Sequence, residues 1–354
     1  MKYIGMDVHK TSIMVSSVDQ DSYVIPPFRV SNTPEHIVKL AQAIERPARV
    51  AMEATRNHAF IHDLLEAQGL DVVVSHPKAT EAITKSKKKS DRHDAITLAK
   101  LLRADMLVES YVPPLQTRLL RELVRECRRL TAASTRTKNR IRATIAQEGM
   151  VCHYSDISGK HARSCLASLA LNPARKRSVE RSLDMIALAQ DQIKAVREQI
   201  VSLVGEDPDV KLLMSIPGVG YLTAAAMLAE IGDISRFSSD RHLASYAGLV
   251  TTTRESAGIV RHGHITKQGS STLRWALVMA TTHLIRRHGP LRSFYERLAD
   301  KHGKKSARTA AARKLLRYIY AILNSRKEYD PGMSVRRGIE CALGRPPVRV
   351  GQAR

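Results

Sequence analysis

Four carboxylates stand where elements of secondary structure are expected to end or begin. Asp7 lies near the end of an apolar stretch, Glu53 directly follows another, and Asp91 and Asp94 lie at the head of an expected helix. Asp91 and Asp94 are three residues apart, so they share one face of that helix. Carboxylate oxygens are ligands that Mg²⁺ prefers, and a pair of such ions can activate one oxygen and stabilise another in phosphoryl transfer. The four acids therefore predict a Mg²⁺ site for phosphoryl transfer.

Each of these acids has an ordinary explanation when it is taken alone. Asp91 fits the cap of the helix that follows it, and Asp94 fits a solvated acid in the first helical turn. His58 and His62 are four residues apart on another expected helix, but histidines on a helical surface are seldom metal ligands. The position of all four acids at element ends, in a chain short of acids, favours the metal site.

The hydrophobic pattern predicts the strands and helices that would position the acids. β-prone apolar runs and helical patterns follow one another in the order βββαβαβα. The strands are expected at residues 2–8, 12–18, 23–30, 48–52 and 70–74, and the helices at 34–45, at 57–68 and from 77. This order predicts a mixed sheet covered by helices, as in the ribonuclease-H-like class, with Asp7 and Glu53 at strand ends.

The charge of the chain predicts a polyanionic partner. Its 354 residues include 57 Lys and Arg against 34 Asp and Glu, a formal net charge of +23. Such an excess indicates nucleic acid. Because only 4% of the residues are aromatic, contacts with the phosphate backbone are expected to dominate over base stacking.

Three groups of cations are candidates for contacts with nucleic acid. The first is a lysine run before Asp91, which would bring a phosphate backbone to the acids, although a solvated basic loop is a serious alternative. The second lies on the polar faces of a long amphipathic helix expected at residues 116–147. The third lies in a stretch at 254–274 that is expected to be a loop. The candidates are Lys87, Lys88, Lys89, Arg125, Arg129, Arg136, Lys138, Arg140, Arg254, Arg261 and Lys267.

A second long helix is expected at residues 178–204, where Ile186, Ile193 and Ile200 recur at steps of seven. Such a seam packs either within one chain as a helical hairpin or between chains as a coiled coil. We favour the coiled coil between chains. Residues 213–232 then carry the pattern helix, Pro-Gly-Val-Gly turn and Ala-rich helix, which is typical of a helix-hairpin-helix.

Ser256 is a second candidate for chemistry, in the expected loop. A serine hydroxyl needs a nearby base or metal before it becomes a good nucleophile. Arg254, Arg261 and Lys267 would hold a phosphate there, and His262 or His264 would move a proton. From spacing alone, Ser256 is an ordinary loop serine. Ser270 and Ser271 are weaker candidates because they lie where a helix cap is wanted.

The chain shows no signal peptide and no apolar stretch long enough to span a bilayer, so a cytoplasmic protein without membrane contact is expected. Its four cysteines have no paired Cys-x-x-Cys spacing and are expected to be reduced.

Taken together, these motifs resemble a known family. The acidic set with Asp-Arg-His-Asp-Ala, the turn Ile-Pro-Gly-Val-Gly, and a block of Ser-x-Gly followed by Gly-x-Ile-Thr-Lys-x-Gly look like the DEDD transposases of bacterial insertion sequences, which join a RuvC-like domain to a serine-bearing domain. The resemblance covers most of residues 1–329. One departure is Ala257, which stands where the family has glycine and would cost more in a left-handed conformation.

The resemblance implies a recombinase that excises and inserts a mobile element. It implies that Asp7, Glu53, Asp91 and Asp94 bind Mg²⁺ and that Ser256 attacks a DNA phosphate. It also implies double-stranded donor and target DNA, a structured guide RNA from the element, and a homo-oligomer, a dimer or tetramer, in which one chain's acids act with another chain's serine.

The expected fold is α/β followed by all-α. A RuvC-like catalytic domain is expected at residues 1–150, a helical coiled-coil linker at 151–206, a helical transposase domain with the helix-hairpin-helix at 207–326, and a disordered tail at 327–354. Two other functions stay open. One is a RuvC-like endonuclease that uses the acids without serine chemistry, and the other is a basic nucleic-acid-binding protein without catalysis.

Overall fold

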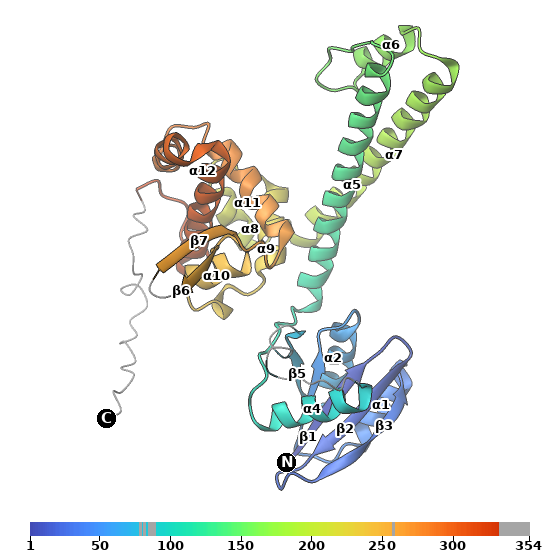
Figure 1. The fold of residues 1–354 in the computed structure, drawn as a ribbon, viewed down its shortest axis with the longest axis vertical. Coiled ribbons are helices and arrows are strands. Elements are labelled where there is room, and N and C mark those ends of the chain that lie inside the picture. Colours follow the sequence, from blue (N-terminus) through green and yellow to red (C-terminus); the bar gives the residue numbers. More distant parts are fainter. Residues whose placement is uncertain (78–79, 81–82, 84–89, 257–258, 333–354) are drawn as a thin grey trace. The chain divides into compact units, whose positions relative to one another are not determined.

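A computed structural model of the chain describes residues 1–332 except 78–79, 81–82, 84–89 and 257–258, and the side chains of residues 253–262 are not described. The chain divides into two compact units, Met1–Val112 and Pro113–Arg354 (Figure 1). The tail predicted to be disordered lies mostly outside the described residues, and so does most of the helix predicted from residue 77. None of the described helices is long and apolar enough to cross a membrane.

The first unit is built on one five-stranded sheet in the order β3-β2-β1-β4-β5. β1 pairs antiparallel with β2 and parallel with β4, so the sheet is mixed as predicted. β2 also pairs antiparallel with β3, and β4 pairs parallel with β5. The strands are β1 (Lys2–Val8), β2 (Ser12–Val18), β3 (Val24–Ser31), β4 (Ala48–Glu53) and β5 (Asp71–Ser75).

Helices cover both faces of this sheet. Side chains of α1 (Pro34–Ala43) and α2 (His58–Ala67), such as Ile37 and Ile61, share a core with Met6 and Val50. Alternate strand residues point to the other face, where Ala51 and Val73 pack against Leu98 and Leu102 of α4 (Asp91–Arg103). A mixed sheet between helices confirms the predicted architecture of the N-terminal region.

The second unit begins with two helices of 32 residues, α5 (Leu115–Ala146) and α7 (Pro173–Val204), with α6 (Lys160–Ser168) between them in the chain. Figure 1 shows α5 and α7 side by side. Leu120 and Val124 of α5 share a core with Val196 and Ile200 of α7. At the other ends of the helices, Ile141 and Ile145 share a core with Val179, Leu183 and Ile186. The pair is therefore an antiparallel hairpin within one chain.

This hairpin corrects the preferred interpretation of the heptad seam. Ile186 and Ile200 are fully buried inside the chain, and Ile193 is partly buried against the same core as Ile200. The apolar face predicted from the heptad spacing is present on α7, but it packs against α5 of the same chain and not against a helix of a second copy. α5 packs with α7 and α9 and belongs with them to the second compact unit, which begins at Pro113. The four predicted domains stay a prediction.

The rest of the second unit is mainly helical, as predicted. It contains α8 (Pro208–Met214), α9 (Tyr221–Ile231), a short 3-10 helix (Ile234–Arg236), α10 (Asp240–Tyr246), α11 (Ser271–Leu284) and α12 (Pro290–Ser325). α8 and α9 flank the predicted Pro-Gly turn, where Gly218 has a φ of +84°. Gly303, with a φ of +79°, interrupts α12.

The stretch at 254–274 is not the loop that was predicted. β6 (Thr251–Ser256) and β7 (Ile259–Ile265) form an antiparallel hairpin, in which Arg254 lies opposite Arg261. The β-branched residues Thr251, Thr252 and Thr253 suit such strands. The density of glycine, serine and charge in this stretch concealed the strand pattern.

Candidate active site

Asp7 is the sixth residue of the seven-residue strand β1, and its neighbours give it an unusual electrostatic environment. Burial raises the pKa of the Asp7 carboxyl above its ordinary value, while His9 acts in the opposite direction. The negative charges of Asp91 and Asp94 raise this pKa further. Asp94 therefore lies close enough to Asp7 to affect it, which places three of the four predicted acids in one electrostatic cluster.

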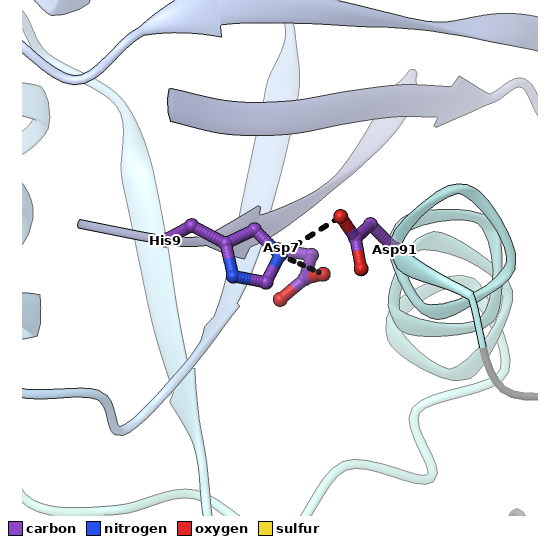
Figure 2. A group of neighbouring side chains, drawn as sticks. All are labelled: Asp7, His9 and Asp91. Atoms are coloured by element: carbon purple, nitrogen blue, oxygen red, sulfur yellow. Dashed lines mark hydrogen bonds and ion pairs between the residues drawn. The ribbon is translucent and has the colours of Figure 1, made fainter. Parts of the chain in front are cut away.

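His9 lies between two of these acids (Figure 2). Its Nε2 is 3.0 Å from Asp7 Oδ2 and 3.3 Å from Asp91 Oδ2. The ligand atoms of Asp7, His9 and Asp91 all lie within 4.8 Å of one another. Asp7 and His9 come from the end of β1, and Asp91 comes from the first turn of α4.

Asp91 is not the cap of its helix. Ser90 takes that place, because its Oγ accepts a hydrogen bond from the backbone N–H of His93. The carboxylate of Asp91 is therefore not used for capping and points toward His9 and Asp7. This removes the ordinary explanation of Asp91 that the sequence left open.

Glu53 ends the strand next to β1. β1 and β4 run parallel, and Met6 is paired with Met52, so Asp7 and Glu53 are the next residues of the two strands at the same end of the sheet. Parallel strands bring their carboxyl ends to one edge, where the sites of open α/β sheets usually lie. All four predicted acids thus belong to elements that meet at this end of the first unit.

Two parts of the chain match models of known protein families. Residues 4–149 match a family model for the DEDD transposase domain of the IS110 type, described as "Transposase". Residues 210–296 match the model described as "Transposase IS116/IS110/IS902 family". The chain belongs to the IS110/IS116 family of transposases. It is therefore an enzyme of DNA recombination, as its motifs predicted.

Curated relatives of this transposase extend over nearly its whole length. A probable family 20 transposase of Pseudomonas aeruginosa is 25% identical over 346 residues, 93% of this chain and 98% of that protein. The transposase for insertion sequence element IS1111A of Coxiella burnetii is 24% identical over 339 residues, 94% of this chain and 92% of that protein. A pilin gene-inverting protein of Moraxella bovis is 35% identical over 154 residues, 42% of this chain and 48% of that protein.

Gly5 is a feature of the transposase site that sequence reasoning missed. A Cβ at this position would lie 2.0 Å from the carbonyl oxygen of Ala95 and 2.6 Å from the backbone nitrogen of Ala99. The backbone of α4 therefore lies directly against β1, which holds Asp91 and Asp94 near Asp7. His9 was missed as well, although its spacing of two residues from Asp7 at a strand end was a visible signal.

The donor set fits a hard divalent cation. The carboxylates of Asp7 and Asp91 lie together beside the His9 ring, Glu53 ends the neighbouring parallel strand, and carboxylate oxygens of this kind suit Mg²⁺. Burial raises the pKa of Asp7, and the charges of Asp91 and Asp94 raise it further, so a cation bound here would favour the ionised carboxylate. A second group, His62, Asp63 and Glu66, lies on the surface of α2 and has only one residue that is not exposed.

The cations predicted to contact nucleic acid have different surroundings. Lys87, Lys88 and Lys89 lie outside the described residues. Arg129, Arg136 and Arg140 are exposed on α5. Lys138 forms an ion pair of 2.8 Å with Asp156. Arg125 donates to both carboxylate oxygens of Glu230, at 2.7 Å and 2.9 Å, and Glu230 has a fully buried side chain.

Ser256 is the last residue of β6, where it pairs with Ile259 of β7, and it lies in the second unit. Arg254 and Arg261 are in the two strands of the same hairpin, and Lys267 is an exposed residue just after it. Ser270 is the N-cap of α11, because its Oγ accepts a hydrogen bond from the Leu273 N–H. This is the capping role that made Ser270 a weaker candidate for the nucleophile.

Proposed function

We propose that this transposase cuts and rejoins the DNA of an insertion sequence at the acidic site of Asp7, Glu53, Asp91 and Asp94, with Mg²⁺ as the metal. The observation that carries the proposal is the convergence of Asp7 and Asp91 on one point, from elements that are 84 positions apart in the chain. Bound there, Mg²⁺ would supply charge stabilisation for phosphoryl transfer. The acids themselves hold the cation and fix its position at the sheet edge.

We propose further that Ser256 is the nucleophile that opens a DNA strand and holds its end for rejoining. Its Oγ forms a bond to a DNA phosphorus while the bond from that phosphorus to the sugar oxygen breaks, and the proton of the serine hydroxyl is passed to the released oxygen. In rejoining, a sugar hydroxyl attacks the same phosphorus and the serine leaves with its proton restored. The support is the family frame around Ser256, with Gly258, Gly263, Ile265, Lys267 and Gly269 in matching places, and its position at the end of a strand that, like its partner strand, carries an arginine.

The partners in this proposal are double-stranded donor and target DNA, a structured guide RNA encoded by the element, and further copies of the chain. The excess of basic residues supports nucleic-acid partners. The guide RNA and the oligomer are supported by the family resemblance. The relatives named as pilin gene-inverting proteins support recombination over cleavage alone, since inversion requires that cut ends be rejoined.

The proposal is tested with full-length protein and a labelled duplex that contains the element's ends and the flanking DNA. Cleavage should require Mg²⁺, disappear with a chelator, and be lost in Asp91→Asn while duplex binding stays within about twofold. A denaturing gel should show a covalent protein–DNA band that is absent in Ser256→Ala.

The outcomes separate the competing functions. Mg²⁺-dependent cleavage without a covalent band, unchanged in Ser256→Ala, would identify a RuvC-like nuclease in which the serine is structural. Binding without cleavage by the wild-type protein, on its own element ends and with the guide RNA present, would favour the non-catalytic alternative. A covalent band that persists in Ser256→Ala and vanishes in Ser271→Ala would assign the role of nucleophile to Ser271.

A further inference from the structure

A basic cavity of about 640 Å³ lies between α5 and the start of α11, within the second unit. On the α5 side it is lined by Arg125, Arg128, Arg129, Ala132 and Arg136, and on the α11 side by residues 270–272. Arg125, Arg129, Ala132 and Arg136 follow one another at intervals of three or four residues, and Arg128 is four residues before Ala132, so all five lie on one side of that helix. The small side chain of Ala132 leaves room between the arginines. We call this cavity the Arg128–Arg136 pocket.

The charges around the Arg128–Arg136 pocket do not cancel. Arg125 is paired with Glu230, which also lies 3.8 Å from Arg121. Arg128 donates hydrogen bonds to the hydroxyls of Ser271 and Thr272, at 3.1 Å and 2.9 Å, and these partners carry no charge. Neither Arg129 nor Arg136 forms an ion pair with an acid among the residues that the structure describes. Three guanidinium groups therefore face the pocket without a compensating carboxylate.

Neighbouring groups show the same excess of positive charge. Burial lowers the pKa of Arg274, and the charge of Arg128 lowers it further. The first turn of α11 has no acidic residue, although a carboxylate is favoured at the positive end of a helix. The N-terminus of α11 therefore adds to the positive potential of the arginines.

Arg128 is also held in place before any ligand binds. Two hydroxyl contacts fix one of its terminal nitrogens, and its guanidinium lies 5.7 Å from the centre of the Trp275 ring. A fixed guanidinium loses less entropy when it binds an anion than a freely moving one does. This separates Arg128 from the exposed arginines elsewhere on α5, such as Arg140.

We propose that the Arg128–Arg136 pocket binds a phosphodiester group of a nucleic-acid strand. Planar guanidinium groups match the oxygens of phosphate, and the cavity offers three of them on one wall. The proposal adds Arg128, Ser271 and Thr272 to the residues that position nucleic acid. It rests on the action of the chain on nucleic acid, and it does not depend on the roles of the acids or Ser256 in the chemistry.

The test places a carboxylate inside the pocket. Ala132→Glu puts a negative charge one turn from Arg128, Arg129 and Arg136, and such pairs favour a helix, so the fold should be kept. Ala143→Glu is the matched control, because Ala143 is exposed on the same helix and outside the pocket. Both variants change the net charge equally, so general electrostatic effects on binding are matched.

The readout is binding of full-length protein to a labelled DNA duplex and to a labelled RNA hairpin of equal length, at several salt concentrations. Ala132→Glu should weaken binding about tenfold and lower the slope of log affinity against log salt by about one, the value for one lost phosphate contact. Ala143→Glu should change affinity less than threefold and leave the slope unchanged. Arg136→Gln should resemble Ala132→Glu, with a smaller loss.

The two nucleic acids identify the source of the phosphodiester. A loss for DNA alone assigns the pocket to donor or target, a loss for RNA alone assigns it to the guide, and a loss for both shows that it reads only the shared backbone. Equal effects of Ala132→Glu and Ala143→Glu on both ligands would overturn the proposal. The Asp91→Asn enzyme should bind like wild type throughout, so failure here is distinct from failure of the acidic site.

Discussion

The acidic site of the first unit and the Arg128–Arg136 pocket of the second unit concentrate charge of opposite sign in different ways. In the acidic site, carboxylates from β1 and α4 converge because the backbone of α4 packs against Gly5. In the pocket, most of the charge comes from one face of a single helix. Convergence from distant elements allows burial and a perturbed pKa, as at Asp7, whereas one helical face leaves Arg129 and Arg136 exposed. The converging carboxylates suit the binding of one cation at a defined point, and the helical face of arginines suits contacts with the phosphate backbone of a nucleic acid.

The largest effect is expected when the acidic site loses one carboxylate. Asp94→Asn should reduce strand cleavage by about a thousandfold or more, since metal-site chemistry depends on each charge. Glu35→Gln is the matched control, because Glu35 is an acid in the first turn of α1 in the same unit. Cleavage rates at saturating Mg²⁺ make the comparison. Equal activity of the two variants would show that Asp94 is only a solvated helical acid.

The arginines of α5 should separate into structural and binding residues. Arg125→Ala leaves the fully buried carboxylate of Glu230 without its two hydrogen bonds from Arg125, although Arg121 remains 3.8 Å away, and loss of hydrogen bonds to a buried charge costs about 2 kcal/mol of unfolding free energy. Arg129→Ala, at an exposed position four residues on, should change this free energy by less than about 0.5 kcal/mol and weaken nucleic-acid binding instead. Denaturant unfolding and duplex binding of both variants measure the separation. A stable Arg125→Ala protein would contradict it.

Gly5→Ala should damage the first unit through packing alone. The new Cβ would meet the α4 backbone at 2.0 Å, and overpacking of this kind costs about 1–3 kcal/mol. Because α4 must move, cleavage should fall together with stability, while the acids are all retained. Gly159→Ala is the control, since its Cβ would meet the nearest atom at an ordinary 3.5 Å. Thermal unfolding and cleavage by Gly5→Ala at wild-type levels would show that α4 does not need this close approach.

The smallest effect concerns the ion pair of Lys138 with Asp156. The hydrogen bond from the Lys138 ammonium, and those from Ser158, lower the pKa of Asp156 from 3.8 to about 2. Because the folded pKa is below the unfolded one, this contribution to stability is present above pH 4 and is lost as the pH falls toward 2. The Asp156 side chain is 57% exposed, so solvent screening should limit the contribution to less than about 1 kcal/mol.

Asp156→Asn should therefore lower the unfolding free energy slightly at pH 7 and not at pH 2. The difference should also shrink in high salt, and unfolding curves of both proteins at the two pH values measure it. A difference that is the same at pH 2 and pH 7 would mean that Asp156 acts through its backbone turn and not through its charge. The variant also frees Lys138, so nucleic-acid binding should tighten modestly.

The sequence by itself determined the elements whose residues follow a local period. β1, β2 and α5 have the predicted limits to within a residue. The four acids were predicted at element ends because the boundaries of strands and helices depend mainly on residues that are close in sequence. The charge excess and the family motifs determined the class of partner and the class of enzyme in the same way. Ser256, in contrast, was predicted in a loop but lies in a strand. The prediction was wrong because the strand pattern around Ser256 is weak and many turn-forming residues surround it.

Only the tertiary structure decided which residues meet. It chose α5 as the partner of the Ile186–Ile200 seam, because a heptad period states that a face is apolar but does not name what covers it. It joined Arg125 to Glu230, 105 positions away, and so gave an acidic partner to one of the cations that the sequence counted as basic surface. It also placed His9 between Asp7 and Asp91 and required glycine at position 5. Such contacts depend on the packing of elements far apart in the chain, which no local pattern of residues records.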